Sequence, residues 1–443
     1  MGETVSLKGK EKGDQFMNRI EKLFHLLENA TSQFHTALAV KEQLLAQGFE
    51  ELTLKENWNL QKGGKYMFIH HGSTIFAFTV GTDFRAEDGF RIAASHGDFP
   101  GFRLKPNAGM EVNGYLQLNT EGYGGAILST WLDRPLSVAG RVVLKSDDVF
   151  KPEVRLIDMK KPILIIPNLA IHFNREMNKG VELRKQVEML PIYGTASEEM
   201  TKEAFLTALA NALDVNCDDI LDYELMIYNV DKPSFVGLND EFVSAPRLDN
   251  LTSTQAIVEG ITQSTRKNGI NMMIVFDHEE IGSRSKQGAA STLLSTILEK
   301  IYLSLGMQTV DFTNALEDSL FMSVDVSHAY HPNYAAKYDV TNKHILNQGF
   351  AIKQAASQSY ATDSEAIAIV QQICEKEGIA YQKFVNHSDS VGGGTIGAIS
   401  SAMLPVRTVD IGVPLLAMHS SRETMGVKDY DSLVDFIGAY FSL

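Results

Sequence analysis

Residues 271–283 read NMMIVFDHEEIGS, an apolar run that stops abruptly at four ionisable residues. A short, continuously apolar run of this kind predicts a strand that is buried on both faces of a sheet. In open α/β sheets, ligands bind beyond the carboxyl ends of the strands. We therefore expect Glu279 and Glu280 to face a site, the alternative being a solvated acidic loop. Because neighbouring side chains diverge, one carboxylate can bind a metal while the other handles a proton.

The bulk composition restricts the class of protein. The chain has 443 residues, with 44% hydrophobic residues and a formal net charge of −15, which predicts a globular chain divided into two domains. The negative charge argues against nucleic acid or a membrane surface as the main partner, because binding phosphates needs a basic face. The polar start of the chain predicts neither a signal peptide nor a membrane span. The only cysteines, Cys217 and Cys374, suit neither a disulfide framework nor a thiolate zinc site, so we expect a cytoplasmic protein.

Periodicity predicts the remaining regular elements. Apolar residues recur at helical spacing in residues 15–28, 32–45, 288–305 and 362–378. Short apolar runs predict strands within residues 65–80, 91–95 and 319–328, the last of which ends in an acid and a histidine. Residues 101–240 change to short β-rich runs with turn signals, interrupted by one helical run near residues 202–213. This change in the pattern of apolar and turn-forming residues predicts an inserted domain.

Ionisable residues follow several of the predicted strands. In His96-Gly97-Asp98, the imidazole can bind a metal while the Asp98 carboxylate accepts its other ring N–H. We expect four other candidate ligands at strand ends as well: Asp249, Glu280, Asp325 and His419. With His96 they make two imidazoles and three carboxylates, a set that suits zinc, cobalt or manganese better than calcium. Five ligands exceed one open zinc site, so we predict two ions about 3.5–4 Å apart, with Glu279 as general base.

These residues lie in motifs that resemble the aspartyl aminopeptidase and aminopeptidase I family of dinuclear metallopeptidases. The motifs span nearly the whole chain: SHGD (95–98), IPNLAIH (166–172), GLNDEF (237–242), PRLDN (246–250), DHEEIGS (277–283), HAYHPNY (328–334) and MHSSRE (418–423). The resemblance implies a mixed-sheet α/β catalytic domain, residues 1–100 and 241–443, interrupted by a β-rich dimerisation domain at residues 101–240. It also implies a dimer-based tetrahedral dodecamer that acts on peptides with a free N-terminus.

The resemblance assigns the metal ligands to two ions. Zinc is the expected metal, and cobalt and manganese are the alternatives. Asp249 would bridge both ions, and the Asp249–Asn250 peptide would be cis. One ion would take His96 and Asp325, and the other would take Glu280 and His419.

The resemblance also implies roles around the metals. Asp98 would orient His96, and Glu279 would deprotonate the activated water and pass the proton to the departing amine. His328 or His331 would stabilise the oxyanion. His172 would reach into the site of a neighbouring subunit.

One segment departs from the eukaryotic aspartyl members of the family. They carry Lys-Gln-Arg-Tyr where this chain has SQSY at residues 357–360. An acidic substrate side chain needs a compensating cation. We therefore predict a preference for neutral or apolar N-terminal residues, with Lys353 the remaining candidate for acidic recognition.

A glycine cluster at residues 392–394 does not fit a phosphate-binding loop. Close approach of its backbone to a ligand, or a tight turn, is the better explanation, and we assign Gly394 to substrate binding. Three alternative functions stay open: an acidic-specific aspartyl aminopeptidase, a dinuclear deacylase or carboxypeptidase, and an inactive metal-stabilised scaffold.

Overall fold

The computed structural model describes residues 19–390 and 392–443, so the polar start of the chain lies outside the described residues. Its largest sheet has nine strands. Their order is β1 (Glu50–Glu51), β2 (Lys65–His70), β3 (Thr74–Val80), β13 (Ile270–Phe276), β4 (Phe90–His96), β14 (Leu320–Val324), β18 (Arg407–Gly412), β16 (Phe350–Gln354) and β17 (Tyr381–Val385). The predicted strands of residues 65–80, 91–95 and 271–276 are confirmed. The strand predicted at residues 319–328 is confirmed only as β14, because residues 327–328 pair in a different sheet.

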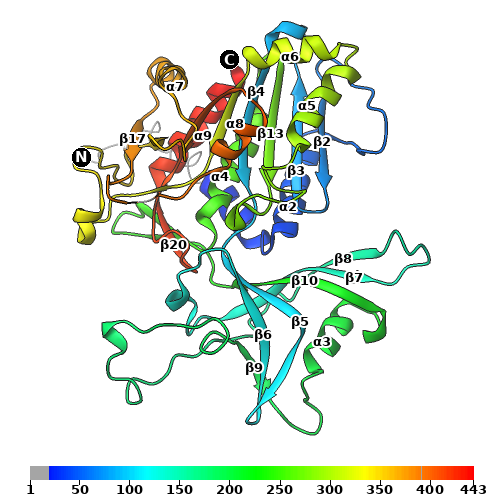
Figure 1. The fold of residues 1–443 in the computed structure, drawn as a ribbon, viewed down its shortest axis with the longest axis vertical. Helices are drawn as coiled ribbons and strands as arrows, with labels where there is room; N and C mark the ends of the chain where they lie inside the picture. The colour runs from blue at the N-terminus through cyan, green and yellow to red at the C-terminus, as the bar shows by residue number, and fades with distance from the viewer. Residues whose placement is uncertain (1–18, 391) are drawn as a thin grey trace, which may run out of the picture.

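The four middle strands of this sheet, β13, β4, β14 and β18, run parallel to one another. Their carboxyl ends therefore meet at one edge, which is where ligands bind in open α/β sheets. Figure 1 shows β13 and β4 side by side in the upper part of the molecule.

Strand β13 is buried on both faces, and all seven of its residues are buried. Met273 and Val275 pack in the apolar cluster that includes α2 (Gln33–Ala46), α4 (Leu248–Gln263), α7 (Ser364–Glu377) and α9 (Val427–Ser442). Met272 and Ile274 pack in the opposite cluster, with α5 (Leu293–Ser304), α6 (Thr309–Glu317) and α8 (Ile396–Met403). Alternate side chains thus enter the two cores of a helix–sheet–helix arrangement.

The predicted helices at residues 32–45 and 362–378 are confirmed as α2 and α7, and the first predicted helix is described from residue 19 to residue 29. The predicted helix at residues 288–305 begins later, at Leu293. The reason is local, because the N–H groups of Gly288 and Ala290 donate to the carbonyls of Ser285 and Ser283 in the preceding loop.

A second sheet lies below the first in Figure 1. It has six antiparallel strands in the order β8 (Glu153–Asp158), β7 (Leu136–Leu144), β10 (Ile220–Asn229), β5 (Gly101–Val112), β6 (Tyr115–Tyr123) and β9 (Ile192–Thr195). Together with α3 (Ala204–Leu213), these strands enclose an apolar cluster of their own. The many strands and the single α-helix of this region are as predicted.

A third sheet has five strands, in the order β11 (Ser234–Val236), β12 (Phe242–Ala245), β20 (Glu423–Gly426), β19 (Pro414–Leu416) and β15 (Ser327–His328). No pattern in the sequence predicted this sheet. It joins segments far apart in the chain, because β12 pairs antiparallel with β20. The segments that follow β12 and β19 are thereby brought together.

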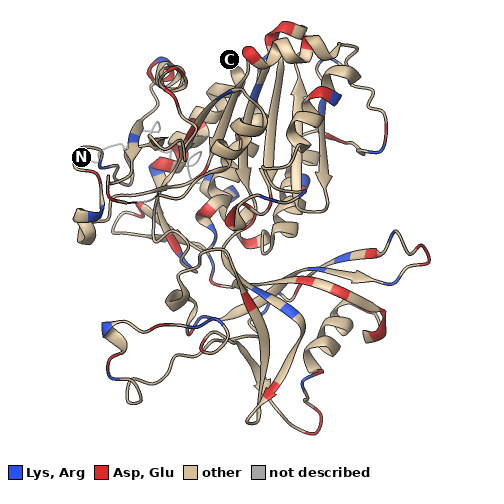
Figure 2. Ribbon diagram, viewed as in Figure 1, with Lys and Arg blue, Asp and Glu red and all other residues tan. Residues whose placement is uncertain are grey.

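Figure 2 shows basic and acidic residues interspersed along the described ribbon. Within the described residues, none of the helices is long and apolar enough to cross a membrane.

Candidate metal centre

The carboxyl edge of the nine-stranded sheet supplies three of the five predicted ligands. His96 is the last residue of β4, and Asp325 directly follows β14. Glu280 lies in a short 3-10 helix, Glu279–Ile281, just beyond β13. These positions agree with the prediction that chemistry gathers where the parallel strands end.

The other two predicted ligands do not come from this edge. Asp249 lies in the first turn of α4, and His419 lies in the loop between β19 and β20 of the five-stranded sheet. The expectation that all five lie at strand ends is therefore wrong for Asp249, because the site forms between two sheets. The peptide bond between Asp249 and Asn250 is cis, as expected.

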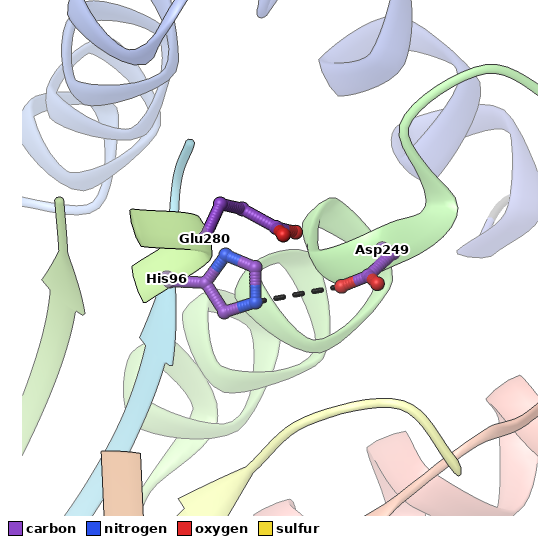
Figure 3. A group of neighbouring side chains, drawn as sticks. All are labelled: His96, Asp249 and Glu280. Atoms are coloured by element: carbon purple, nitrogen blue, oxygen red, sulfur yellow. Dashed lines mark ion pairs between the residues drawn. The ribbon is translucent and has the colours of Figure 1, made fainter. Parts of the chain in front are cut away.

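The two histidines face opposite oxygens of Asp249. His96 Nε2 lies 3.4 Å from Asp249 Oδ1, and His419 Nε2 lies 3.3 Å from Asp249 Oδ2. Figure 3 shows His96 and Asp249 pointing toward one another, with Glu280 beside them. A carboxylate placed in this way can share its two oxygens between two ions.

Each of the two remaining candidate carboxylates lies near one of these histidines. Asp325 Oδ1 lies 3.6 Å from His96 Nε2, and Glu280 Oε2 lies 3.5 Å from His419 Nε2. Oxygen or nitrogen atoms of His96, Asp249 and Glu280 all lie within 4.8 Å of one another. Asp325 thus lies near His96 and Glu280 lies near His419, while His96 and Glu280 also lie close to one another.

Backbone carbonyls determine the tautomers of both histidines. His96 Nδ1 lies 3.0 Å from the carbonyl oxygen of Asp98, and His419 Nδ1 lies 3.2 Å from that of Gly125. A carbonyl oxygen can only accept, so each Nδ1 carries the proton and each Nε2 is free to bind a metal. The Asp98 carboxylate is farther from His96, at 3.5 Å, so its main-chain oxygen is the closer partner of the ring.

Buried polar atoms without partners show that these residues fit cations. Asp249 Oδ1 and Glu280 Oε1 are buried and have no hydrogen-bond partner among the residues that the structure describes. Burial, with the nearby Asp249 charge, raises the pKa of Glu280 well above its usual value. Buried carboxylates this close together need compensating positive charge. Divalent metal ions would supply it, and the mixed nitrogen and oxygen donors suit zinc.

Glu279 lies beside the candidate ligands but is farther from His96 than the ligands Asp249 and Asp325 are. Its side chain is 17% exposed, and its Oε2 lies 4.0 Å from His96 Nε2. Burial, with Asp325 and Asp98 nearby, raises the pKa of Glu279 to about 7, although His96 opposes the rise. A base of that pKa is well matched to proton transfer near neutral pH.

Comparison with known proteins identifies the family. Residues 26–441 match the family described as Aminopeptidase I zinc metalloprotease (M18). The chain belongs to the M18 family. It is therefore a zinc aminopeptidase, a hydrolase of the exopeptidase class. This confirms the resemblance seen in the sequence motifs.

Relatives and solved structures are similar to this chain along nearly its whole length. A protein of Clostridium novyi (strain NT) described as Probable M18 family aminopeptidase 2 is 47% identical over 411 residues, which cover 92% of this chain and 95% of that protein. The structure described as Cryo-EM structure of the Ape4 and Nbr1 complex is 34% identical with a TM-score of 0.92, covering 96% of this chain and 86% of that one. The S. cerevisiae mApe1 dodecamer is 25% identical with a TM-score of 0.83, covering 95% of each chain.

Two residues of this M18 aminopeptidase support the centre although the sequence motifs gave them no role. Glu423, at the start of β20, accepts hydrogen bonds from the backbone N–H groups of His419 (2.8 Å) and Asp249 (3.0 Å). The hydroxyl of Tyr123 donates to Asp98 Oδ2 at 2.8 Å. Glu423 belongs to the MHSSRE motif, so its adjacency to His419 was the available signal. Nothing local in the sequence connects Tyr123 with the site.

The predicted oxyanion residues lie next to the ligands. His328 and His331 line a cavity of about 190 Å³ that is also bounded by His419. His331 Nδ1 accepts a hydrogen bond from the backbone N–H of Asn333.

Of the three residues predicted to bind substrate, Lys353 lies beside the predicted ligand Asp325. Lys353 is only 1% exposed, donates to the carbonyl of Val326 at 3.1 Å, and lies 3.7 Å from Asp325 Oδ2. His172 is exposed in the loop between β8 and β9, and Gly394 is exposed in the loop before α8. Among the described residues, no hydrogen bond or ion pair connects His172 or Gly394 with the ligands.

Proposed function

We propose that this M18 enzyme removes N-terminal residues with two divalent ions, zinc in both positions, held by the five ligands. The opposed oxygens of Asp249 carry this proposal, because each faces a different histidine. Bound zinc ions would lower the pKa of a water and polarise the scissile carbonyl. The family match favours this reaction over the deacylase, carboxypeptidase and scaffold alternatives.

Glu279 is the general base of the proposed reaction. It takes the proton of the attacking water and delivers it to the departing amine. Its position next to the ligand Glu280 supports this role, because the two side chains diverge from neighbouring positions. His328 and His331 are the candidate donors to the developing oxyanion.

The cavity beside His419 supports a preference for neutral or apolar N-terminal residues. Besides three histidines and Tyr338, its lining residues are apolar: Leu415, Leu416, Ala417 and Met418. No lysine or arginine is among them. The ammonium of Lys353 lies between Asp325 and the Val326 carbonyl, which makes it a weak candidate for binding an acidic substrate. An aspartyl preference is the alternative.

An aminoacyl p-nitroanilide panel tests the reaction and the preference together. The metal-reconstituted enzyme is assayed on leucyl, aspartyl, lysyl and N-acetyl-leucyl substrates, beside the Glu279→Gln variant. We expect release from the leucyl substrate, lost on acetylation and in the variant. Aspartyl preference, or equal rates on leucyl and aspartyl substrates, would overturn the neutral preference. Activity on the acetylated substrate would overturn the need for a free amine.

We further propose that residues 101–240 form an inserted domain that carries contacts between subunits of a dodecamer. The six-stranded sheet has its own apolar cluster, and the solved relative mApe1 is described as a dodecamer. Large apolar side chains are exposed around His172, among them Leu169, Ile171 and Phe173. Analytical ultracentrifugation of the wild type and of a Phe173→Ser variant tests this, and a monomeric wild type would contradict it.

We also propose a cytoplasmic location, which the two free cysteines, Cys217 and Cys374, support. A fluorescent fusion in the native host would locate the protein, and its recovery outside the cytoplasm would contradict the proposal.

A further inference from the structure

A segment of the six-stranded sheet reaches the metal centre. Residues Tyr123, Gly124 and Gly125, here called the YGG segment, form the end of β6 and the bend that follows it. We propose that the YGG segment is a positioning element, which holds ligands of both metal sites from outside the sheets that carry them. The proposal rests on the two-ion centre proposed above.

Gly124 packs directly against the ligand Glu280. Its φ is +67°, and a Cβ built on it would lie 3.2 Å from Glu280 Cβ and 3.4 Å from Glu280 Oε2. The backbone conformation and the close approach both favour glycine. Gly124 therefore limits where the Glu280 side chain can lie.

Tyr123 acts through Asp98. Its hydroxyl donates to Asp98 Oδ2, while the backbone N–H groups of Glu279 and Glu280 donate to the same carboxylate at 3.2 Å each. Tyr123 is only 7% exposed and Asp98 only 1%. The main-chain oxygen of Asp98 is also the partner of the His96 ring. Tyr123 thus fixes one residue that supports ligands on both sides of the centre.

Gly125 and the residues after it hold the His419 loop. The carbonyl of Gly125 accepts from His419 Nδ1, and the N–H of Ile127 donates to the His419 carbonyl at 2.9 Å. Farther along, the N–H of Ser421 donates to Thr130 Oγ1 at 2.9 Å, and the Ser421 hydroxyl donates to the Thr130 carbonyl. The loop that carries His419 is therefore bound along one side to the chain that leaves β6.

The consequence is that metal affinity depends on a segment that contributes no ligand. Partners of this kind orient the ligands, and removing one typically weakens metal binding about 10-fold to 100-fold. Without the YGG segment, Asp98 would lose its tyrosine donor and the His419 ring would lose the acceptor that fixes its tautomer.

Two substitutions in the YGG segment test the proposal, each with a matched control at the opposite end of β6. Gly124→Ala is compared with Gly114→Ala, because Gly114 has a φ of +83° and a Cβ added to it would have no neighbour within 4 Å in the described part of the chain. Tyr123→Phe, which removes only the hydroxyl, is compared with Tyr115→Phe, at a side chain 52% exposed. Zn²⁺ affinity is measured by competition with a chromophoric chelator, and the absorption spectrum of the Co²⁺-loaded protein reports ligand geometry.

We expect Zn²⁺ affinity to fall about 10-fold in Tyr123→Phe and at least as much in Gly124→Ala, with altered Co²⁺ spectra and unchanged controls. Affinities and spectra equal to those of the controls would overturn the positioning role. If Gly124→Ala does not fold, Tyr123→Phe decides alone, because its change leaves the packing surface intact. The wild type is titrated first, since uptake of fewer than two ions would overturn the two-ion centre itself, independently of the variants.

Discussion

Removing the charge of Glu279 should have opposite effects on stability and on catalysis. Glu279 is largely buried beside other carboxylates, which raises its pKa from 4.5 to about 7 in the metal-free protein. At about 1.36 kcal/mol per pKa unit, ionising it in the folded state costs about 3 kcal/mol more than in the unfolded state. Glu279→Gln removes this cost, so the metal-free variant should be more stable than the wild type at pH 8.

The sign of the pH dependence follows from the raised pKa. The folded protein holds the Glu279 proton more tightly than the unfolded chain does. The wild type is therefore not penalised below about pH 4.5, and it loses stability through this group as the pH rises toward about 7. The stability difference between variant and wild type should be about 3 kcal/mol at pH 8 and should vanish near pH 4.5.

Urea unfolding in the presence of a chelator, at pH 8 and at pH 4.5, measures this difference. Glu111→Gln, at an exposed position of β5, serves as the control and should change neither value. A Glu279→Gln variant less stable than the wild type at pH 8 would refute the desolvation argument. After metal loading, the same variant should lose about 10²-fold to 10⁴-fold in kcat, and a loss smaller than tenfold would refute its role as the base.

Three further predictions concern residues around the centre. Glu423→Gln should weaken Zn²⁺ binding about 10-fold to 100-fold. The two oxygens of Glu423 accept from two backbone N–H groups, and an amide has only one acceptor oxygen, so one buried donor is left unpaired at a cost of about 1–3 kcal/mol. Glu241→Gln, at an exposed carboxylate that also accepts a backbone N–H, should leave Zn²⁺ affinity unchanged, and equal chelator competition by the two variants would contradict the prediction. Lys353→Met should lower Zn²⁺ affinity, because the ammonium of Lys353 no longer positions the ligand Asp325. The ratio of leucyl to aspartyl hydrolysis should stay unchanged, and a changed ratio would assign Lys353 to substrate binding. Burial and the nearby His328 lower the pKa of His344 to about 3, so the stability that its neutral ring contributes is present above pH 6.5 and is lost as the pH falls. In the presence of chelator, the His344→Phe variant should lose about 2 kcal/mol less stability than the wild type between pH 7 and pH 5. Equal losses would contradict the lowered pKa of His344.

The central strand was predictable because burial on both faces leaves a direct trace in the sequence. The run before Asp277 is apolar at nearly every position, which is typical of a strand that has a core on each side. The boundaries of α5 were less predictable, because loop hydrogen bonds compete with helix formation at Gly288 and Ala290.

The ligand types were also predictable from the sequence, but their arrangement was not. Histidine and carboxylate motifs indicated two metal ions. Which oxygen of Asp249 faces which histidine is decided only when β12, β19 and β20 pair in the five-stranded sheet. Tyr123 had no assigned role for the same reason, since Asp98 lies in another segment of the chain. Glu423 lies in the motif of His419, but its second partner, Asp249, lies in a distant segment.

The sequence by itself determined the fold class, the family and the identity of the candidate ligands, because apolar periodicity and motif chemistry are local properties. The tertiary structure alone decided how the metal centre is supported. Phe242 pairs with Gly426, and Tyr123 at the end of β6 reaches Asp98 in the loop between β4 and β5. Such contacts depend on strand register and on the packing of one sheet against another, which local patterns of residues do not encode.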